Sequence, residues 1–320
     1  MNLRGVCDYI SQKHPVRFNR EQKDVFSVYL SHLFAHCGFD PDKVAITKMR
    51  DSVENNNIIV GDPKKAEYYV TAHYDTPGRT GFLFSSAKLL GKALSWILLF
   101  VIILVLALGF VFALTHFYPN LPYWHKFGLC FGLLVLMVLF FVVIPGLTPN
   151  KNNANTSSGL FAVISMAERV AADPELKDKT CFVVFDNSEW GALGASAFAK
   201  WCKKKGIGTE NKKVFCLDHL GSGDKLTLCA ASKKSAESAA YKQLEKALSD
   251  SGVEFEKLTD STFITGDNVQ FKNSVMISRL NHSRLGPVYI PDVATKKDTA
   301  CNIEAIENIG NIICDAIKNN

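Results

Sequence analysis

The order of apolar and polar positions predicts strands that alternate with helices. From Asp8 to Cys37 apolar residues recur at helical spacing, and Pro15 separates a short helix from a longer one around Glu21 to His36. β-branched and aromatic runs predict strands, and periodic segments predict later helices: strands at 57–60, 68–72, 180–185, 214–217 and 274–278, helices at 160–171, 236–251 and 303–317. This alternation indicates an α/β fold, with a mostly parallel central sheet and helices on both faces. Gly61-Asp62-Pro63 joins the first two strands, which are expected to pair as a hairpin.

Two stretches in the middle of the chain are apolar on every face. Ala93 to Thr115 contains no charged residue, Phe127 to Leu147 is equally apolar, and an aromatic turn around Trp124 separates them. At helical rise each is long enough to cross a hydrocarbon core of about 30 Å. They predict a transmembrane hairpin at 91–148, with the lipid bilayer as a partner, between two parts of one soluble domain at 1–90 and 149–320. Two buried core helices are the alternative.

Charge and cysteine content bear on compartment and partners. The flanks of the hairpin carry Arg79, Lys88, Lys92 and Lys151, whereas its turn carries Lys126, so the positive-inside tendency places the soluble domain in the cytoplasm. Nine scattered cysteines without a C-x-x-C pair agree with reduced thiols. A net charge of +5 is too small to predict nucleic-acid binding. The charged amino terminus predicts no cleavable signal peptide.

Polar side chains follow three of the predicted strands. His73 and Asp75 come after the strand at 68–72, two residues apart and therefore on one face. Glu189 follows the strand at 180–185, and Asp218 follows the strand at 214–217. Open α/β sheets place their sites at the carboxyl ends of strands, and imidazole with carboxylate ligands suits Zn²⁺. Taken alone, His73 and Asp75 suit a hydrogen-bonded loop and a turn cap equally well.

The order of these motifs resembles the zinc-dependent exopeptidases of clan MH, which include secreted bacterial aminopeptidases and the inactive ectodomain of the transferrin receptor. Five pieces carry the resemblance: the His-x-Asp strand end at 72–76, the A-N-D-N-x-S-G-like loop at 153–159, F-D-x-E-E-x-G-L-x-G at 185–194, the third acidic ligand at 217–221, and H-T-x-x-D-T at 293–299. The resemblance covers most of both soluble segments. It implies a three-layer sandwich interrupted by the hairpin.

The resemblance also implies roles for the polar residues. In active relatives two zinc ions share a bridging Asp, and a Glu accepts the proton of the attacking water. His73 and Asp218 match ligands of the first metal, Glu189 matches a ligand of the second, and Asp75 matches the carboxylate that orients the histidine. Asp267, with the residue after it, falls where relatives line the specificity pocket.

Three positions depart from the family pattern. Asn155 stands at the bridging position, where a neutral amide offers no charge to hold two cations together. Ser188 stands at the general-base position, and Ala294 stands where a histidine ligand is expected. The first metal site therefore keeps two ligands and an amide oxygen, and the second keeps only Glu189.

Other residues offer replacements for the lost groups. Asp186 would serve as the bridge if the loop were aligned one residue off, and His219 or His282 would replace the missing histidine. A two-zinc centre is not expected, whereas one weakly filled zinc site is. The sequence predicts a membrane-anchored homologue of zinc aminopeptidases with impaired or lost peptidase activity, acting as a binding module for peptide-like ligands. The alternative is an active exopeptidase with an atypical, single-zinc centre.

Overall fold

The chain folds into two compact units. The computed structural model describes residues 2–79, 87–139, 144–259, 264, 266–284 and 288–319. Unit 1 comprises residues 1–77, 151–281 and 290–320, and unit 2 comprises residues 78–150 and 282–289. Unit 1 is thus assembled from stretches of chain on both sides of the apolar segment.

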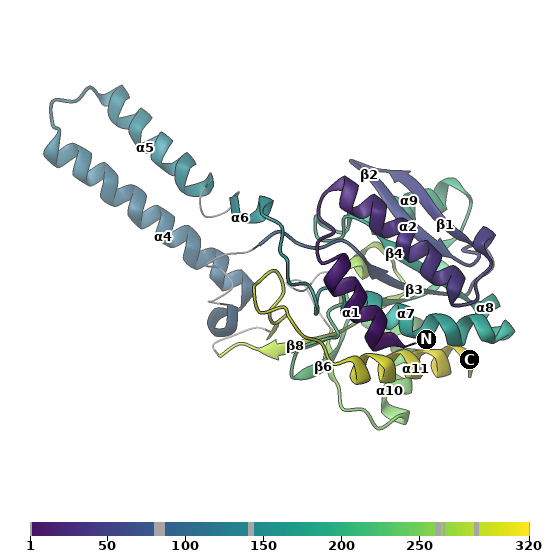
Figure 1. The fold of residues 1–320 in the computed structure, drawn as a ribbon. Coiled ribbons are helices and arrows are strands. Elements are labelled where there is room, and N and C mark those ends of the chain that lie inside the picture. Colours follow the sequence, from purple (N-terminus) through teal and green to yellow (C-terminus); the bar gives the residue numbers. More distant parts are fainter. Residues whose placement is uncertain are drawn as a thin grey trace. The chain divides into compact units, whose positions relative to one another are not determined.

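Unit 1 is organised around one mixed sheet with the order β1-β2-β4-β3-β5-β8-β6-β7 (Figure 1). The central strands β4, β3, β5 and β8 run parallel. β2 pairs antiparallel with β1 and β4, whereas β6 pairs antiparallel with β8 and parallel with β7. The strands are β1 (Val44–Arg50), β2 (Glu54–Val60), β3 (Tyr68–His73), β4 (Thr180–Phe185), β5 (Lys213–Leu217), β6 (Lys225–Cys229), β7 (Glu256–Leu258), β8 (Ser274–His282) and β9 (Val288–Tyr289). The predicted α/β fold is confirmed.

The predicted hairpin between the first two strands is wrong. β2 pairs with β1 and β4, and β3 lies between β4 and β5. Both β2 and β3 are buried along nearly their whole length, so each needs a neighbour on both edges. β1, which pairs with the outer edge of β2, was not predicted as a strand because it mixes apolar and charged residues.

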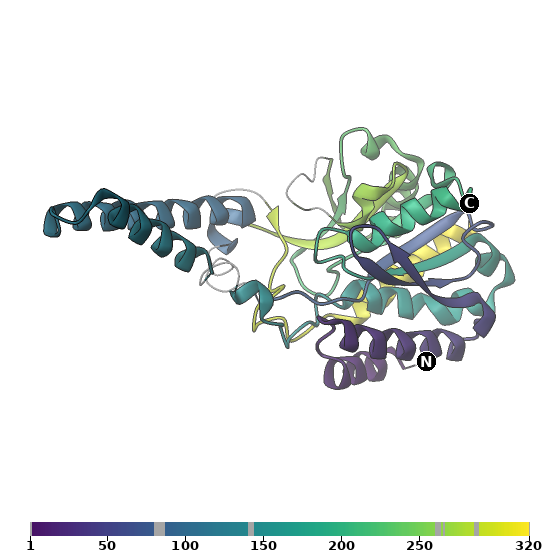
Figure 2. The same cartoon turned by 90° about the horizontal axis from the view of Figure 1, so that it is seen from above.

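Helices cover both faces of the sheet (Figure 2). The face that carries Tyr68 and Val70 packs against α1, α2, α7, α8, α10 and α11, and the opposite face, which carries Tyr69, packs against α9. The helices are α1 (Leu3–Lys13), α2 (Arg20–His36), α7 (Ser158–Ala172), α8 (Pro174–Lys179), α9 (Leu193–Lys204), α10 (Ala239–Asp250) and α11 (Ile303–Lys318), with short 3₁₀ turns η1 (Pro41–Lys43), η3 (Thr209–Asn211), η4 (Ser235–Glu237) and η5 (Asp267–Gln270). Three layers result, as the resemblance implied.

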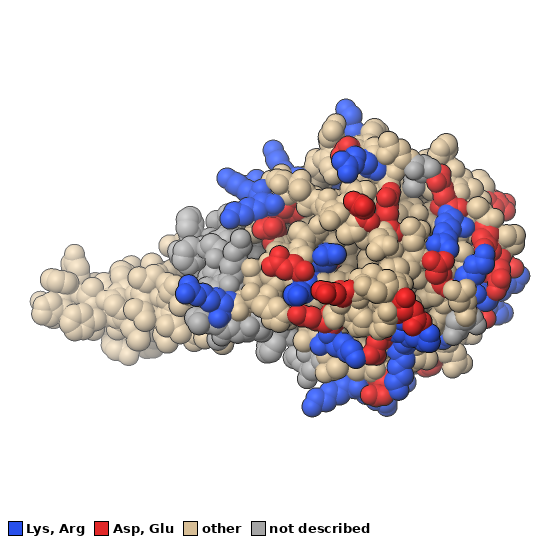
Figure 3. Space-filling model, turned by 90° about the horizontal axis from the view of Figure 1, so that it is seen from below, with Lys and Arg blue, Asp and Glu red and all other residues tan. Residues whose placement is uncertain are grey.

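Unit 2 contains the apolar helices α4 (Ala87–Phe117), α5 (Tyr123–Val138) and α6 (Ile144–Leu147). Within the described residues one helical stretch, Phe100–Phe117, is long and apolar enough to cross a membrane. The second predicted span differs from a single helix over 127–147, because α5 ends at Val138 and residues 140–143 lie outside the described residues. Between residues 97 and 138 the one Asp, Glu, Lys or Arg is Lys126, and the helices present a surface almost free of charged side chains (Figure 3).

The two ends of the apolar insertion lie next to each other. Gly78 and Pro149 form an antiparallel bridge, and the N–H of Arg79 donates to the carbonyl of Thr148 at 2.7 Å. A Cβ at residue 78 would lie 1.9 Å from the carbonyl oxygen of Gly146, so only glycine permits this approach. The apolar insertion therefore begins and ends at adjacent points of the chain.

Candidate metal centre

The end of β3 presents a buried imidazole between two carboxylates. His73 is the last residue of β3, and its Nδ1 lies 3.2 Å from Oδ1 of Asp75. Its Nε2 lies 3.2 Å from Oδ1 of Asp218, which follows β5. Because β3 and β5 are parallel neighbours, their carboxyl ends meet at this edge of the sheet.

A second imidazole stands beside Asp218. Nδ1 of His219 lies 2.6 Å from Oδ1 of Asp218, and the ring centroids of His219 and His73 are 5.9 Å apart. His219 has a left-handed backbone with φ of 49°, a conformation that is uncommon outside glycine and that clusters at functional sites. This kink places the ring of His219 beside Asp218 and His73.

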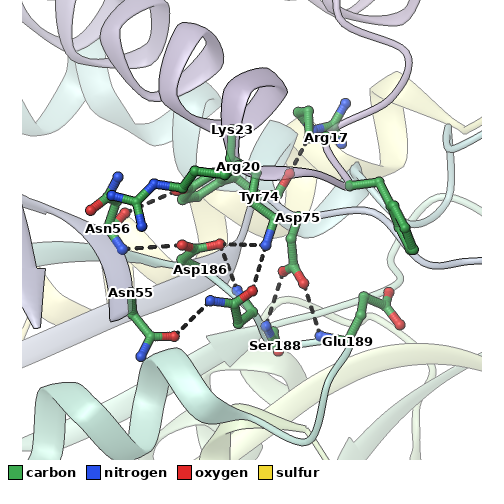
Figure 4. Close-up of polar contacts among 12 residues, drawn as sticks. Arg17, Arg20, Lys23, Asn55, Asn56, Tyr74, Asp75, Asp186, Ser188 and Glu189 are labelled. Atoms are coloured by element: carbon green, nitrogen blue, oxygen red, sulfur yellow. Dashed lines mark hydrogen bonds and ion pairs between the residues drawn. The ribbon is translucent and has the colours of Figure 1, made fainter. Parts of the chain in front are cut away.

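Asp75 also fixes the turn that carries Glu189. The backbone N–H of Ser188 donates to Oδ1 of Asp75 and that of Glu189 donates to Oδ2, each at 3.1 Å (Figure 4). One buried carboxylate therefore contacts the histidine of β3 and the turn after β4. It ties two ligand-bearing strand ends into one assembly.

His73, Glu189 and His219 form a group that suits a metal ion. One ligand atom from each lies within 4.8 Å of the others. Oε1 of Glu189 and Nε2 of His219 are buried without a hydrogen-bond partner among the described residues, and such orphaned polar atoms are rare unless something binds them. Two imidazoles and one carboxylate with a fourth position open is the donor set of catalytic zinc sites. These residues therefore fit one zinc ion.

The titration of these groups reflects their close packing. Burial opposes charging of both imidazoles, but hydrogen bonds to Asp218 and Asp75 raise the pKa of His73 well above its usual range, and the charge of Asp218 raises the pKa of His219. Burial opposes ionisation of Asp218, yet His219 holds the pKa of Asp218 far below its usual range. Burial raises the pKa of Glu189. Zinc binding at these residues would therefore compete with protons on the imidazoles and on Glu189.

Asn155 lies in the loop before α7, with its side chain fully engaged by the backbone. Its Oδ1 accepts the N–H groups of Gly221 and Ser222, each at 2.9 Å, and its Nδ2 donates to the carbonyl of Pro291 at 3.1 Å. Asp298 accepts the N–H of Asn155 as well. The amide oxygen therefore supports the loop after β5. Its role at the bridging position stays a prediction.

Ser188, at the predicted base position, is paired with a carboxylate that sequence reasoning did not connect to it. Its Oγ donates to Oδ1 of Asp267 at 2.8 Å. Asp267 is the first residue of η5 and is 3 % exposed. Burial raises the pKa of Asp267 to about 7. A buried carboxyl group with a raised pKa thus accepts the hydrogen bond of the Ser188 hydroxyl.

The other replacement residues lie apart from this group. Asp186 forms a buried ion pair with Lys23 of α2: Nζ of Lys23 lies 2.9 Å from Oδ1 of Asp186. The carboxylate of Asp186 therefore binds α2 and not the group formed by His73, Glu189 and His219. His282 is exposed at the end of β8. Ala294 is buried, with a left-handed φ of 59°. Of the histidines considered as replacements, His219 is the one that the fold brings beside His73 and Glu189.

Arg17, in the segment between α1 and α2, contacts two of the segments that form the site. The buried guanidinium of Arg17 donates to the carbonyl of Tyr74 and to Oγ of Ser157, each at 2.5 Å, and to the carbonyl of His14 at 2.7 Å. Arg17 thereby joins the end of β3 to the loop that carries Asn155. The sequence did not predict that Arg17 is buried, because a single Arg before a helix is usually exposed.

Comparisons with known proteins identify the family and the fold of the chain. The sequence profile of peptidase family M28 matches residues 155–316, just over half of the 320-residue chain. No curated protein matches the sequence. Among solved structures, the aminopeptidase LapA of Legionella pneumophila aligns over 99 % of this chain and 70 % of its own, with 11 % identity and a TM-score of 0.59.

Two further structures align along nearly their whole length. A Zn-dependent exopeptidase of Parabacteroides distasonis aligns over 100 % of this chain and 98 % of its own, with 15 % identity and a TM-score of 0.58. The glutaminyl cyclase of Porphyromonas gingivalis aligns over 98 % and 96 %, with 13 % identity and a TM-score of 0.59. At these identities the likeness establishes the fold that unit 1 adopts.

Proposed function

This chain belongs to peptidase family M28, and from that premise we propose that it is a membrane-anchored, single-zinc homologue of the aminopeptidases that binds peptide amino termini and hydrolyses them slowly. The proposal rests on the group formed by two buried imidazoles, His73 and His219, and the partly buried carboxylate of Glu189. This group supplies three donors for one cation. Asn155 offers no charge for a second, and its amide is already hydrogen-bonded on both sides.

The residues around this group support a hydrolytic role with a weakened base. A bound zinc ion would supply Lewis-acid polarisation of the substrate carbonyl. Ser188 stands where the general base is expected, and its Oγ hydrogen-bonds to Asp267. Ser188 then takes a proton from the nucleophile as it passes its own to Oδ1 of Asp267, whose pKa of about 7 allows exchange near neutral pH. Transfer through a hydroxyl is less effective than direct transfer to a carboxylate, so turnover falls below that of two-zinc relatives.

Cyclisation of an amino-terminal glutamine is a second candidate reaction. The structures that resemble this chain include glutaminyl cyclases. In cyclisation the substrate's own amine is the nucleophile, and an intramolecular attack depends less on activating a water. A site in which a hydroxyl replaces the general base suits such a reaction. A peptide with an amino-terminal glutamine therefore accompanies the amino-acid anilides as a substrate.

Zinc content and turnover of the full chain in detergent test the proposal. We expect about one zinc ion per chain, slow anilide hydrolysis that a chelator abolishes, and loss of the bound zinc in His219→Ala and Glu189→Gln. His282→Ala removes an exposed histidine and is the matched control that keeps its zinc. Two zinc ions per chain, or an unchanged zinc content in His219→Ala, would contradict the proposed centre.

The anchor and its orientation belong to the same proposal. The apolar surface of α4 and α5 supports insertion into a bilayer, and the basic residues Arg79 and Lys151 at the ends of the insertion support a cytoplasmic unit 1. Protease added to sealed vesicles that expose the cytoplasmic face should digest unit 1. Protection of unit 1 in those vesicles would reverse the orientation.

A further inference from the structure

The turn that carries Glu189 is held by a buried cation from the amino-terminal helix. Asn19 and Gln22 form a capping box that begins α2, and Lys23 lies in the first turn that this cap fixes. Nζ of Lys23 lies 2.9 Å from Oδ1 of Asp186 and donates to Oδ1 of Asn187 at 2.5 Å. The side chains of Lys23 and Asp186 are 6 % and 3 % exposed, so this ion pair is shielded from water (Figure 4).

Asp186 and Asn187, the two partners of Lys23, also make hydrogen bonds that fix the backbone of the turn. Oδ2 of Asp186 accepts the N–H of Asn56 at 3.1 Å, and its Oδ1 accepts the N–H of Asn187 at 2.8 Å. Asn187 has a left-handed φ of 51°, and its Nδ2 donates to Oδ1 of Asn55 at 2.9 Å. The kink at Asn187 is thus fixed by contacts from α2 and from β2.

The other half of the turn is fixed by Asp75. Its two carboxylate oxygens accept the N–H groups of Ser188 and Glu189. Four consecutive residues are therefore held from opposite sides, the first two by Lys23 and the last two by Asp75. Because Glu189 ends this segment, the direction of its side chain depends on both supports.

Lys23 also offsets the negative charge gathered at this edge of the sheet. Burial raises the pKa of Asp186, and the charge of Lys23 opposes that rise. Asp75 is a second buried carboxylate whose charge acts on Asp186. Without Lys23, two buried carboxylates would face each other beside the metal ligands, and the turn would move to separate them.

We propose that Lys23 is a positioning residue of the metal centre: its buried ion pair with Asp186 fixes the turn that presents Glu189 and so sets the affinity for zinc. The inference rests on the proposed zinc site. It adds a determinant outside the residues that the family profile matches. Groups that hold metal ligands in place commonly change metal affinity by about 10–100-fold, and Lys23 acts on Glu189 through the turn at residues 186–189.

Zinc affinity of the full chain, measured by competition with a chromogenic chelator, tests the inference. We expect Lys23→Met to weaken zinc binding by about 10–100-fold and to alter the visible spectrum of the cobalt-substituted protein, which reports ligand geometry. Arg20→Met is the matched control, because Arg20 lies on the same helix in exposed ion pairs with Asp24 and Glu54, and its zinc affinity should not change.

Asp186→Asn provides a second route that keeps the size of the side chain and leaves Lys23 without its anionic partner. Asp186→Asn should weaken zinc binding as well. Because the two substitutions remove the same ion pair, the double variant Lys23→Met/Asp186→Asn should bind zinc about as tightly as the single variant with the lower zinc affinity. If Lys23→Met does not fold, Asp186→Asn decides alone. Wild-type chain that binds no zinc would refute the proposed function, whereas wild-type chain that binds zinc with unchanged affinity in the folded variants would refute only the role of Lys23.

Discussion

At the scale of single residues, the proposed metal centre depends on side chains that make two kinds of contact. Asp75 contacts His73 and also holds the N–H groups of Ser188 and Glu189. Asp218 lies between the two imidazoles. A substitution here therefore changes both a ligand and the backbone beside it, and a loss of zinc is expected to accompany a loss of stability.

Asp267 gives a pH-dependent prediction for the zinc-free protein. Burial raises its pKa from 3.8 to about 7, so the folded chain keeps a proton that the unfolded chain has already lost over this interval. Stability from this group therefore falls as pH rises from about 4 to 7, by an amount on the order of 1 kcal/mol or more. Asp267→Asn stays neutral and keeps a partner for Ser188.

Unfolding of Asp267→Asn and wild type in the presence of a chelator measures this effect. The variant should be more stable than wild type at pH 8, and the difference should shrink toward pH 4. Asp250→Asn, in an exposed i,i+4 pair with Lys246, is the control and should show no such growth in the difference. If the difference in unfolding free energy between the variant and wild type were the same at pH 4 and pH 8, folding would not raise the pKa of Asp267.

The sequence revealed the residues at strand ends better than the contacts between them. His73, Glu189 and Asp218 were found because parallel strands bring their carboxyl ends to one edge of a sheet. The position of His219 depends on a left-handed kink, which has no signature in a His-Leu-Gly sequence. Lys23 was missed because a lysine in a helix is usually exposed.

At the scale of secondary-structure elements, close approach of a helix to a strand places the loop after β5. Gly159 lies in the first turn of α7, and a Cβ there would lie 2.1 Å from the carbonyl oxygen of Leu217. No side chain can be accommodated without moving β5 or α7. Since Asp218 and His219 follow directly, this contact connects helix packing to the metal centre.

Gly159→Ala should therefore destabilise the protein by about 1–3 kcal/mol or more and weaken zinc binding. Chemical unfolding and chelator competition measure the two effects. Gly5→Ala is the control, because a Cβ at Gly5 in α1 makes only ordinary contacts, of 3.5 Å or more, and the change should stabilise the helix by up to about 1 kcal/mol. Normal stability of Gly159→Ala would show that α7 and β5 are farther apart than described.

The strand pairing shows where pattern reasoning at this scale ends. Alternation of strands and helices predicted the fold class and the bounds of β3, β4 and α11 to within a residue or two. The hairpin between β2 and β3 was wrong because β4, more than a hundred residues later, separates them. Sequence-local turn signals such as Gly61-Asp62-Pro63 carry no information about such a partner.

At the scale of the whole molecule, the adjacent ends of the insertion give a prediction about the hairpin. The bridge between Gly78 and Pro149 and the hydrogen bond from Arg79 to Thr148 bring the ends within reach of a short turn. Replacing residues 80–147 with a Gly/Ser linker of about four residues should give a chain that is soluble without detergent and keeps its zinc content.

Membrane fractionation supplies the comparison. The full chain should sediment with membranes and resist alkaline carbonate, whereas the shortened chain should remain in the supernatant, with the unfolding transition of unit 1 retained. Release of the full chain by carbonate would argue against a bilayer anchor. Aggregation of the shortened chain would mean that unit 1 needs the hairpin to fold.

The place of β3 in the sheet constrains how the protein is made. β3 lies between β4 and β5, yet it leaves the ribosome before the apolar helices, and both of its neighbours leave after them. Neither edge of β3 can therefore be covered until β4 ends at residue 185, and its second edge stays open until β5 ends at residue 217. The apolar helices α4 and α5 are completed within this interval, so the proposed membrane anchor would form before the sheet can close.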